Sequence, residues 1–185
     1  MSTLLVNNLQ SNQANGVITV SSGNVVYSPG SIIQVQSTTL VNTFSAAPNG
    51  TWTDVTGMSV TITPRTTNSR VLIIVSAVIG GSGTTAKARL LRNIPSANTV
   101  IANGTASGSR QSSMFGSFNT VDGNQDVPAT SNFLDSPGST SPITYKLQIN
   151  NDNTVTVYLN RSPSDLDSAT GGRYISTITA FEVAQ

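Results

Sequence analysis

The chain has 185 residues, of which only 9% are Asp, Glu, Lys or Arg, and its net charge is +1. Nucleic-acid-binding proteins gather basic residues on one face; the nine Lys and Arg residues here are scattered, so nucleic acid is not expected as a partner. With neither His nor Cys, the chain lacks the usual general base at neutral pH, a reactive thiol and the common zinc ligands.

The N-terminal part of the chain is uncharged: Met1 to Thr53 contains no Asp, Glu, Lys or Arg, and the first charge is Asp54. A disordered arm in water is normally poor in hydrophobic residues, whereas this stretch places Leu, Val and Ile among Asn, Gln, Ser and Thr. We therefore expect extended chain that packs against other copies of itself or a larger assembly. The turn signal at Pro29-Gly30 divides the chain, which predicts an N-terminal attachment arm over residues 1–30 and a head domain over residues 31–185.

Neither a signal peptide nor a membrane-inserted segment is expected. The N-terminus lacks the basic start and continuous apolar stretch of a signal peptide. The longest apolar run, Val71 to Ile79, falls short of the roughly 20 residues that cross a bilayer. We expect a protein that is made and folded in a cytoplasm.

Most segments alternate apolar and polar residues with the period of a β-strand. Ile143 to Asn150 and Val155 to Asn160 alternate in this way, and the intervening Asn150 to Asn153 are residues that tolerate turn conformations. We therefore predict that these two strands form a hairpin. Val71 to Ile79 is apolar on both faces, which predicts a central strand covered on both sides.

The final stretch, Arg173 to Val183, also alternates, with Phe181 and Val183 on one face and Ile178 and Glu182 on the other. Because Ile178 interrupts the more polar face, we predict a strand that is covered twice, once by a neighbouring subunit. Ala86 to Asn93 is the best candidate for a helix, but its pattern fits a strand equally well. Turn signals recur between all these runs, and short strands at such spacing predict an all-β, antiparallel sandwich or barrel.

Catalysis is not expected. A Ser–Lys pair would require Lys87 or Lys146, and both stand in alternating patterns where a solvated face is the simpler interpretation. A glycosidase needs only two carboxylates, which Asp165 and Asp167 in one loop, or Asp122–Asp126 in another, could supply. We interpret both loops as solvated charge. The second loop resembles the opening of a calcium loop but lacks its Gly, and a looser calcium site in either loop stays an alternative.

The aromatic residues allow two interpretations. Phe115, Phe118 and Phe133, with Met114 nearby, could line a receptor pocket, although core packing is the simpler interpretation. Trp52 is similarly interpreted as a packing anchor rather than a platform for a sugar. We predict no catalytic, cofactor-binding or metal-binding residue.

Four segments from Ser69 onward carry a resemblance to a family of phage virion proteins, particularly those of phages of cyanobacteria and marine bacteria: Asn132–Gly138 (NFLDSPG), Thr144–Leu147 (TYKL), Thr156–Ser162 (TVYLNRS) and Ser176–Val183 (STITAFEV). The N-terminal phrases Val17–Asn24 (VITVSSGN) and Pro29–Gln36 (PGSIIQVQ) resemble the attachment arm of the same proteins. Such motifs occur in tail fibres, head fibres and capsid decoration proteins alike.

The resemblance implies a trimeric jelly roll similar to the tumour-necrosis-factor and complement globular heads, with an extended N-terminal β arm. A charge-poor domain without disulfides is also stabilised readily by a cyclic oligomer that buries its surplus surface. The implied function is that of a non-enzymatic virion structural protein without a cofactor, made in the host cytoplasm.

Two roles are open within this interpretation. The first is a homotrimeric capsid cement or decoration protein whose arm docks on the major capsid protein, or on a tail or baseplate protein. The alternative is a short tail or head fibre that binds a host-surface receptor or glycan. No long shaft of repeats separates the arm from the head, which favours a short spike or a clamp. A free lectin-like head and a carboxylate-based glycan depolymerase are further alternatives.

Overall fold

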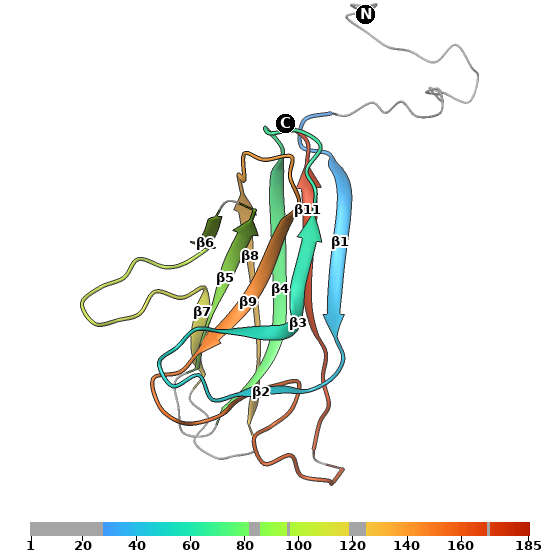
Figure 1. The fold of residues 1–185 in the computed structure, drawn as a ribbon. Coiled ribbons are helices and arrows are strands. Elements are labelled where there is room, and N and C mark those ends of the chain that lie inside the picture. The colour runs from blue at the N-terminus through green and yellow to red at the C-terminus, as the bar shows by residue number, and fades with distance from the viewer. Residues whose placement is uncertain (1–27, 82–85, 96, 119–124, 170) are drawn as a thin grey trace, which may run out of the picture.

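The computed structural model describes residues 28–81, 86–95, 97–118, 125–169 and 171–185, which form eleven β-strands and no helix (Figure 1). The strands are β1 (Ile32–Leu40), β2 (Phe44–Ala46), β3 (Thr53–Ile62), β4 (Arg70–Gly81), β5 (Ala86–Ile94), β6 (Ala97–Ile101), β7 (Phe115–Phe118), β8 (Asp126–Asp135), β9 (Ile143–Asn150), β10 (Val157–Leu159) and β11 (Ser176–Val183).

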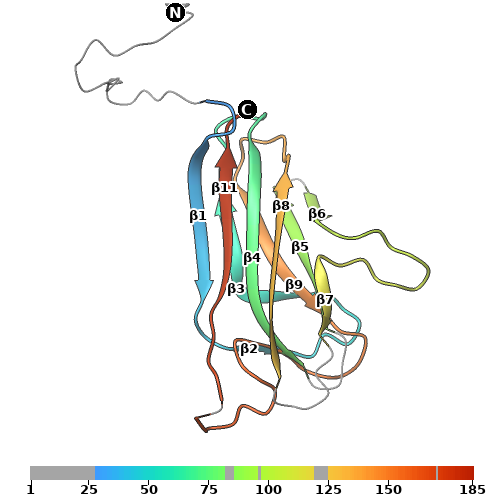
Figure 2. The same ribbon diagram turned by 180° about the vertical axis from the view of Figure 1, so that it is seen from behind.

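The strands form two antiparallel sheets that pack face to face. Sheet A has the order β1-β11-β4-β10-β2, with β8 on the other side of β4. Sheet B has the order β3-β9-β5-β6, with β7 also paired to β5. Seen from behind, β1, β11, β4 and β8 stand side by side (Figure 2). The first and last strands are thus neighbours, and the chain crosses between the sheets from β2 through β5 and again from β7 through β10, as in a jelly roll. The predicted antiparallel jelly-roll β-sandwich is confirmed.

Strand β4 is the centre of sheet A, as its apolar sequence predicts. β8 pairs with one edge, and β11 and β10 share the other. Its inward side chains are at most 1% exposed: Val71, Ile73, Val75, Ala77 and Ile79. The prediction of cover on both sides is wrong for the chain by itself, because the outward Leu72, Ile74 and Val78 are only half-buried.

Strand β11 points its more polar face inward. Ser176, Ile178, Ala180 and Glu182 are all fully buried, while Phe181 on the opposite face is half-buried. The Glu182 carboxylate is not left unpaired: its Oε1 accepts hydrogen bonds from the Arg65 backbone N–H at 2.6 Å and from the Ser69 hydroxyl at 2.7 Å. Burying a charged group requires such donors. The second cover of β11 by a neighbouring subunit stays a prediction.

The predicted hairpin of residues 143–160 is wrong, because β9 lies in sheet B and β10 lies in sheet A. The Asn-rich connection crosses from one sheet to the other. Asn150 and Asn151 are fully buried; the Asn150 carboxamide oxygen accepts from the Asn151 N–H at 2.7 Å, and that of Asn151 accepts from the Asn153 N–H at 2.6 Å. These side-chain oxygens accept hydrogen bonds from the backbone of the buried connection. Strand β9 pairs with β3 and β5, and strand β10 pairs with β2 and β4.

Ala86–Ile94 is a strand, so the helical alternative for this segment is wrong. Ala86, Ala88 and Leu90 point inward and are at most 1% exposed. Lys87 and Arg89 alternate with them and are half-buried. The short inward side chains leave room for the opposite sheet, and the long outward ones reach solvent.

Asn160 connects the ends of β1, β10 and β11 by hydrogen bonds. It has φ +64° and is fully buried, a conformation that Asn tolerates better than most residues. Its Nδ2 donates to the carbonyls of Leu40 at 2.8 Å and Asn42 at 2.9 Å, and its Oδ1 accepts from the Ser176 hydroxyl at 2.6 Å. This residue of the TVYLNRS motif therefore has a structural role between β1, β10 and β11.

The chain enters the β-sandwich through the predicted turn at Gly30, which has φ +87°. The Gly30 N–H donates to the Ala184 carbonyl at 2.8 Å, and the Ala184 N–H donates to the Ser31 carbonyl at 2.9 Å. The last residues before β1 are thus joined to the end of β11. Most of the predicted arm, residues 1–27, lies outside the described residues, and the domain division stays a prediction.

Candidate functional site

The outer face of sheet A, which points away from sheet B, carries no charge between Arg70 at one end and Asp126 at the other in the described strands. Strand register places its side chains in rows across β1, β11, β4 and β8. We call this set the uncharged face; it comprises Ile32, Val35, Ser37, Thr39, Leu72, Ile74, Ser76, Val78, Pro128, Thr130, Asn132, Leu134, Thr177, Thr179, Phe181 and Val183.

One row of the uncharged face is entirely apolar. It runs from Val35 through Phe181 and Leu72 to Leu134. Val35 is 50% exposed and Leu134 is 36% exposed. The neighbouring row pairs hydroxyls, with Ser37 Oγ and Thr179 Oγ1 at 2.8 Å. A continuous apolar patch without charge is typical of a protein–protein contact surface.

The outer face of sheet B is charged instead. Asp54 accepts from Gln148 Nε2 at 2.6 Å and from Lys146 Nζ at 3.1 Å, and Gln148 Oε1 accepts from Arg89 Nε at 2.7 Å. The Arg89 guanidinium lies 4.4 Å from the centre of the Trp52 ring. Partial burial raises the pKa of Asp54, but the hydrogen bonds from Gln148 and Lys146 outweigh burial and leave it below its usual range. The face is thus a polar network across β3, β9 and β5.

The lysines lie where strand alternation places them. Lys87 on β5 forms an ion pair with Asp152, and Lys146 on β9 pairs with Asp54. Neither pairing resembles a Ser–Lys nucleophile, in which the amine must accept a proton from a neighbouring hydroxyl.

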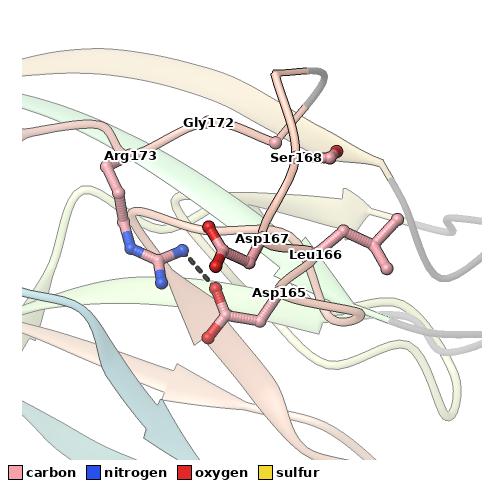
Figure 3. A pocket seen from close by; sticks show the side chains of 7 residues that line it. Asp165, Leu166, Asp167, Ser168, Gly172 and Arg173 are labelled. Carbon is pink, nitrogen blue, oxygen red and sulfur yellow. Dashed lines mark hydrogen bonds and ion pairs between the residues drawn. The ribbon is translucent and has the colours of Figure 1, made fainter.

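The loop with Asp165 and Asp167 lines a hollow of about 270 Å³ (Figure 3). Asp165 forms ion pairs with Arg173 and, at 3.4 Å, with Arg161. The hydrogen bond from Arg173 is the main cause that lowers the pKa of Asp165. A glycosidase acid needs a carboxyl whose pKa is raised. Asp165 therefore does not fit the role of the acid, and its ion pairs with Arg161 and Arg173 fit a role in holding the loop.

Arg173→Gln is expected to raise the pKa of Asp165 toward the ordinary value, since it removes the strongest donor to the carboxylate. In the native loop the folded-state pKa is depressed, so the stabilising contribution is fully present above the unfolded pKa of about 3.9 and is lost as pH falls through the folded pKa. Carbon-13 NMR of the Asp165 carboxyl between pH 2 and 6 measures both values. Equal pKa values in the two proteins would contradict the pairing, and Arg65→Gln serves as a control that leaves Asp165 unchanged.

The other residues considered from the sequence are dispersed. Met114, Phe115 and Phe133 pack against the hydrophobic core, which agrees with the simpler interpretation. The side chain of Phe118 and all of Asp122 lie outside the described residues. Asp126 begins β8 and hydrogen bonds the Tyr174 hydroxyl, which raises the pKa of Tyr174.

No group of three or more acidic, His or Cys residues that could hold a metal ion occurs among the residues that the structure describes. Within the same residues, no helix is long and apolar enough to cross a membrane.

A second hollow, which no sequence pattern predicts, lies beside the charged face of sheet B. Its volume is about 450 Å³, and we call it the polar hollow; it is lined by Lys87, Ser109, Arg110, Gln111, Ser113, Gly116 and Asp152. Three separate segments meet there: β5, the stretch 109–116 that leads into β7, and the turn after β9. No motif spans such residues, so only their meeting in the fold reveals them.

Neither a known protein family nor a curated protein sequence matches the chain. Among solved structures, the chain is similar to the infectious bursal disease virus Gx strain (TM-score 0.43, 14% identity) and Gt strain (TM-score 0.40, 13% identity). A mutant VP2 protein of the same virus, from derived T=1 particles, has a TM-score of 0.39 and 15% identity. Each alignment covers 91% of this chain and 41% of the other, so the chain spans less than half the length of these proteins.

Proposed function

We propose that the protein is a non-enzymatic structural component of a phage particle, in which three copies assemble through the uncharged face and residues 1–30 attach the trimer to the particle. The first role is that of a capsid cement or decoration protein. The observation that supports assembly is the contrast between the two outer faces. Sheet A exposes an apolar row without charge, whereas sheet B exposes a charged network.

This contrast suits a closed ring of copies. Each copy turns its uncharged face toward a common axis and its charged face toward solvent. The neighbours would then supply the second cover that Leu72, Ile74 and Val78 of β4 lack within one chain. The number three comes from the resemblance to trimeric phage heads.

The attachment arm is uncharged and enters the head at Gly30, next to β1, which is an edge strand of sheet A. A partner sheet or strand can bind such a segment through backbone hydrogen bonds, with its Val and Ile side chains in apolar pockets. The partner we propose is the major capsid protein, or a tail or baseplate protein in the alternative role.

The alternative role is a short fibre that binds a host-surface receptor or glycan. The observation that favours it is the position of the polar hollow, which lies on the side of sheet B and stays accessible when sheet A is covered. Three such heads in one trimer would bind a surface more strongly than one.

Removal of residues 1–27 is expected to leave a folded trimeric head that no longer binds particles, because every described strand begins at Ile32 or later. The measurement adds the purified full chain or the truncated chain to particles that lack the protein and counts bound copies by quantitative mass spectrometry. A bound ratio comparable with the major capsid protein indicates cement, and a far smaller ratio indicates a fibre. Normal binding of the truncated head would contradict attachment through the arm, and no binding of the full chain would contradict the virion role.

A further inference from the structure

The backbone is held in place on two sides of the polar hollow. On one side, β7 approaches β5 so closely that a Cβ at Gly116 would lie 2.8 Å from the Lys87 Cα. On the other side, the loop before β7 is held by hydrogen bonds from the Gly104 N–H to the Ser113 carbonyl at 3.1 Å and from the Met114 N–H to the Ala88 carbonyl at 2.8 Å.

The amide of Gln111 is also fixed in position. Its Oε1 accepts from Nδ2 of Asn150 at 3.0 Å, and Asn150 is fully buried at the end of β9. The same Asn150 amide contacts the Gly50 carbonyl at 3.4 Å. The hollow therefore does not need to be assembled by its ligand, which lowers the entropic cost of binding.

The lining determines which kind of ligand fits. Its side chains are hydroxyl, amide and charged groups, with no aromatic or aliphatic residue among the seven. Ligand sites for apolar molecules and for stacked bases are lined largely by hydrophobic and aromatic side chains. A ligand rich in hydroxyl groups can instead exchange hydrogen bonds with Ser109, Gln111 and Ser113.

The charges of the lining add a preference for an anion. Lys87 is already paired with Asp152. Arg110 is exposed and makes long contacts only to Ser107, 3.4 Å to its carbonyl and 3.5 Å to its hydroxyl, with no carboxylate partner in the described part of the chain. A guanidinium without a counter-charge is well suited to bind a carboxylate through two parallel hydrogen bonds.

We propose that the polar hollow binds an acidic saccharide, with Arg110 holding the carboxylate of a uronic acid unit and the hydroxyl and amide side chains holding the sugar hydroxyls. This inference does not depend on trimer formation or on attachment to a particle. It assigns a ligand class to the side of sheet B, which the proposed assembly through sheet A would leave open.

The test is titration calorimetry of the full chain, in its native assembly and at low salt, with tetragalacturonate and with the neutral galactotetraose of the same length. Tetragalacturonate is expected to bind and galactotetraose to bind at least about tenfold more weakly, because the charge-assisted bond to Arg110 is lost. Arg110→Gln is expected to weaken tetragalacturonate binding at least about tenfold. Asp152→Asn is expected to strengthen it, because Lys87 then loses its competing carboxylate and is available to the sugar.

The opposite signs of these two effects distinguish a ligand site from general damage to the fold. Arg65→Gln, a change of an exposed Arg in the loop between β3 and β4, is the matched control and is expected to leave the affinity unchanged. Thermal unfolding midpoints equal to that of the unchanged protein establish that each variant is folded. Equal binding of the two sugars, no binding of either, unchanged affinity in Arg110→Gln or weaker binding in Asp152→Asn would each overturn the proposal.

Discussion

Leu72→Glu is expected to convert the proposed trimer into a folded monomer. Leu72 lies in the apolar row of the uncharged face, between Phe181 of β11 and Leu134 of β8. In a closed ring, each copy would bring a carboxylate into the same dry interface, where like charges cost several kcal/mol. Within one chain the side chain is only half-buried and points away from the core, so the sandwich itself should tolerate the change.

Light scattering on a sizing column measures the outcome. We expect the unchanged protein to have three times the chain mass of 19.2 kDa and Leu72→Glu to have that mass once. Thr61→Glu is the matched control: Thr61 is exposed on the outer face of sheet B, where it contacts the Thr144 hydroxyl. Assembly lost in Thr61→Glu as well, or kept in Leu72→Glu, would contradict an interface on sheet A.

The sandwich fold was predictable because alternation along each strand is local. The inward residues of β4, β5 and β9 follow the apolar positions of the sequence, and the turn at Gly30 has the positive φ that its Gly permits. These features depend on neighbouring residues in the chain, which the sequence displays directly.

The burial of β11 was less predictable, because it depends on partners outside the strand. By composition, the face with Phe181 and Val183 is the more apolar one, yet the face with Ser176 and Glu182 is buried. Glu182 can be buried because the loop before β4 supplies the Ser69 hydroxyl and a backbone N–H. The apolar face is consequently left outward, where it joins the uncharged face.

The connection after β9 shows the same limit. A run of Asn residues is compatible with a tight turn or with a longer buried crossing, since Asn side chains satisfy backbone groups in both. The crossing forms because β10 pairs with β2 and β4 in the opposite sheet, and these pairings are not visible in the local sequence. The polar hollow could not be predicted from the sequence either, because only the fold brings Lys87 and Asp152 beside the stretch 109–116.

We expect substitutions in a buried cluster of charged and polar side chains to lower the free energy of unfolding strongly. Asp135 of β8 lies in sheet A and is 5% exposed. Its carboxylate accepts from Arg92 Nη1 on β5 at 2.8 and 3.0 Å and from the Tyr145 hydroxyl on β9 at 2.8 Å, so it joins the two sheets. Burial, followed by the neighbouring Asp135 charge, raises the pKa of Tyr145; the phenol therefore stays protonated and donates its hydrogen bond.

Asp135→Ala is expected to lower the free energy of unfolding by about 3–5 kcal/mol, because it leaves the largely buried Arg92 charge and the Tyr145 hydroxyl without their acceptor. Urea denaturation at one fixed protein concentration measures the change, since the proposed assembly would make stability depend on concentration. Asp152→Ala is the matched control: it breaks the Lys87 pair, whose Asp side chain is 46% exposed, and should cost at most about 1 kcal/mol.

The double variant Arg92→Leu with Asp135→Leu identifies the cause of the loss. It removes both charges and fills their space with apolar groups, so a stability above that of Asp135→Ala is expected if the unpaired Arg92 charge is responsible. Equal losses in Asp135→Ala and Asp152→Ala would show that the cluster contributes no more than a surface ion pair. Asp135 belongs to the NFLDSPG segment and Tyr145 to the TYKL segment. The hydrogen bond between them joins the two sheets, so both segments have a structural role.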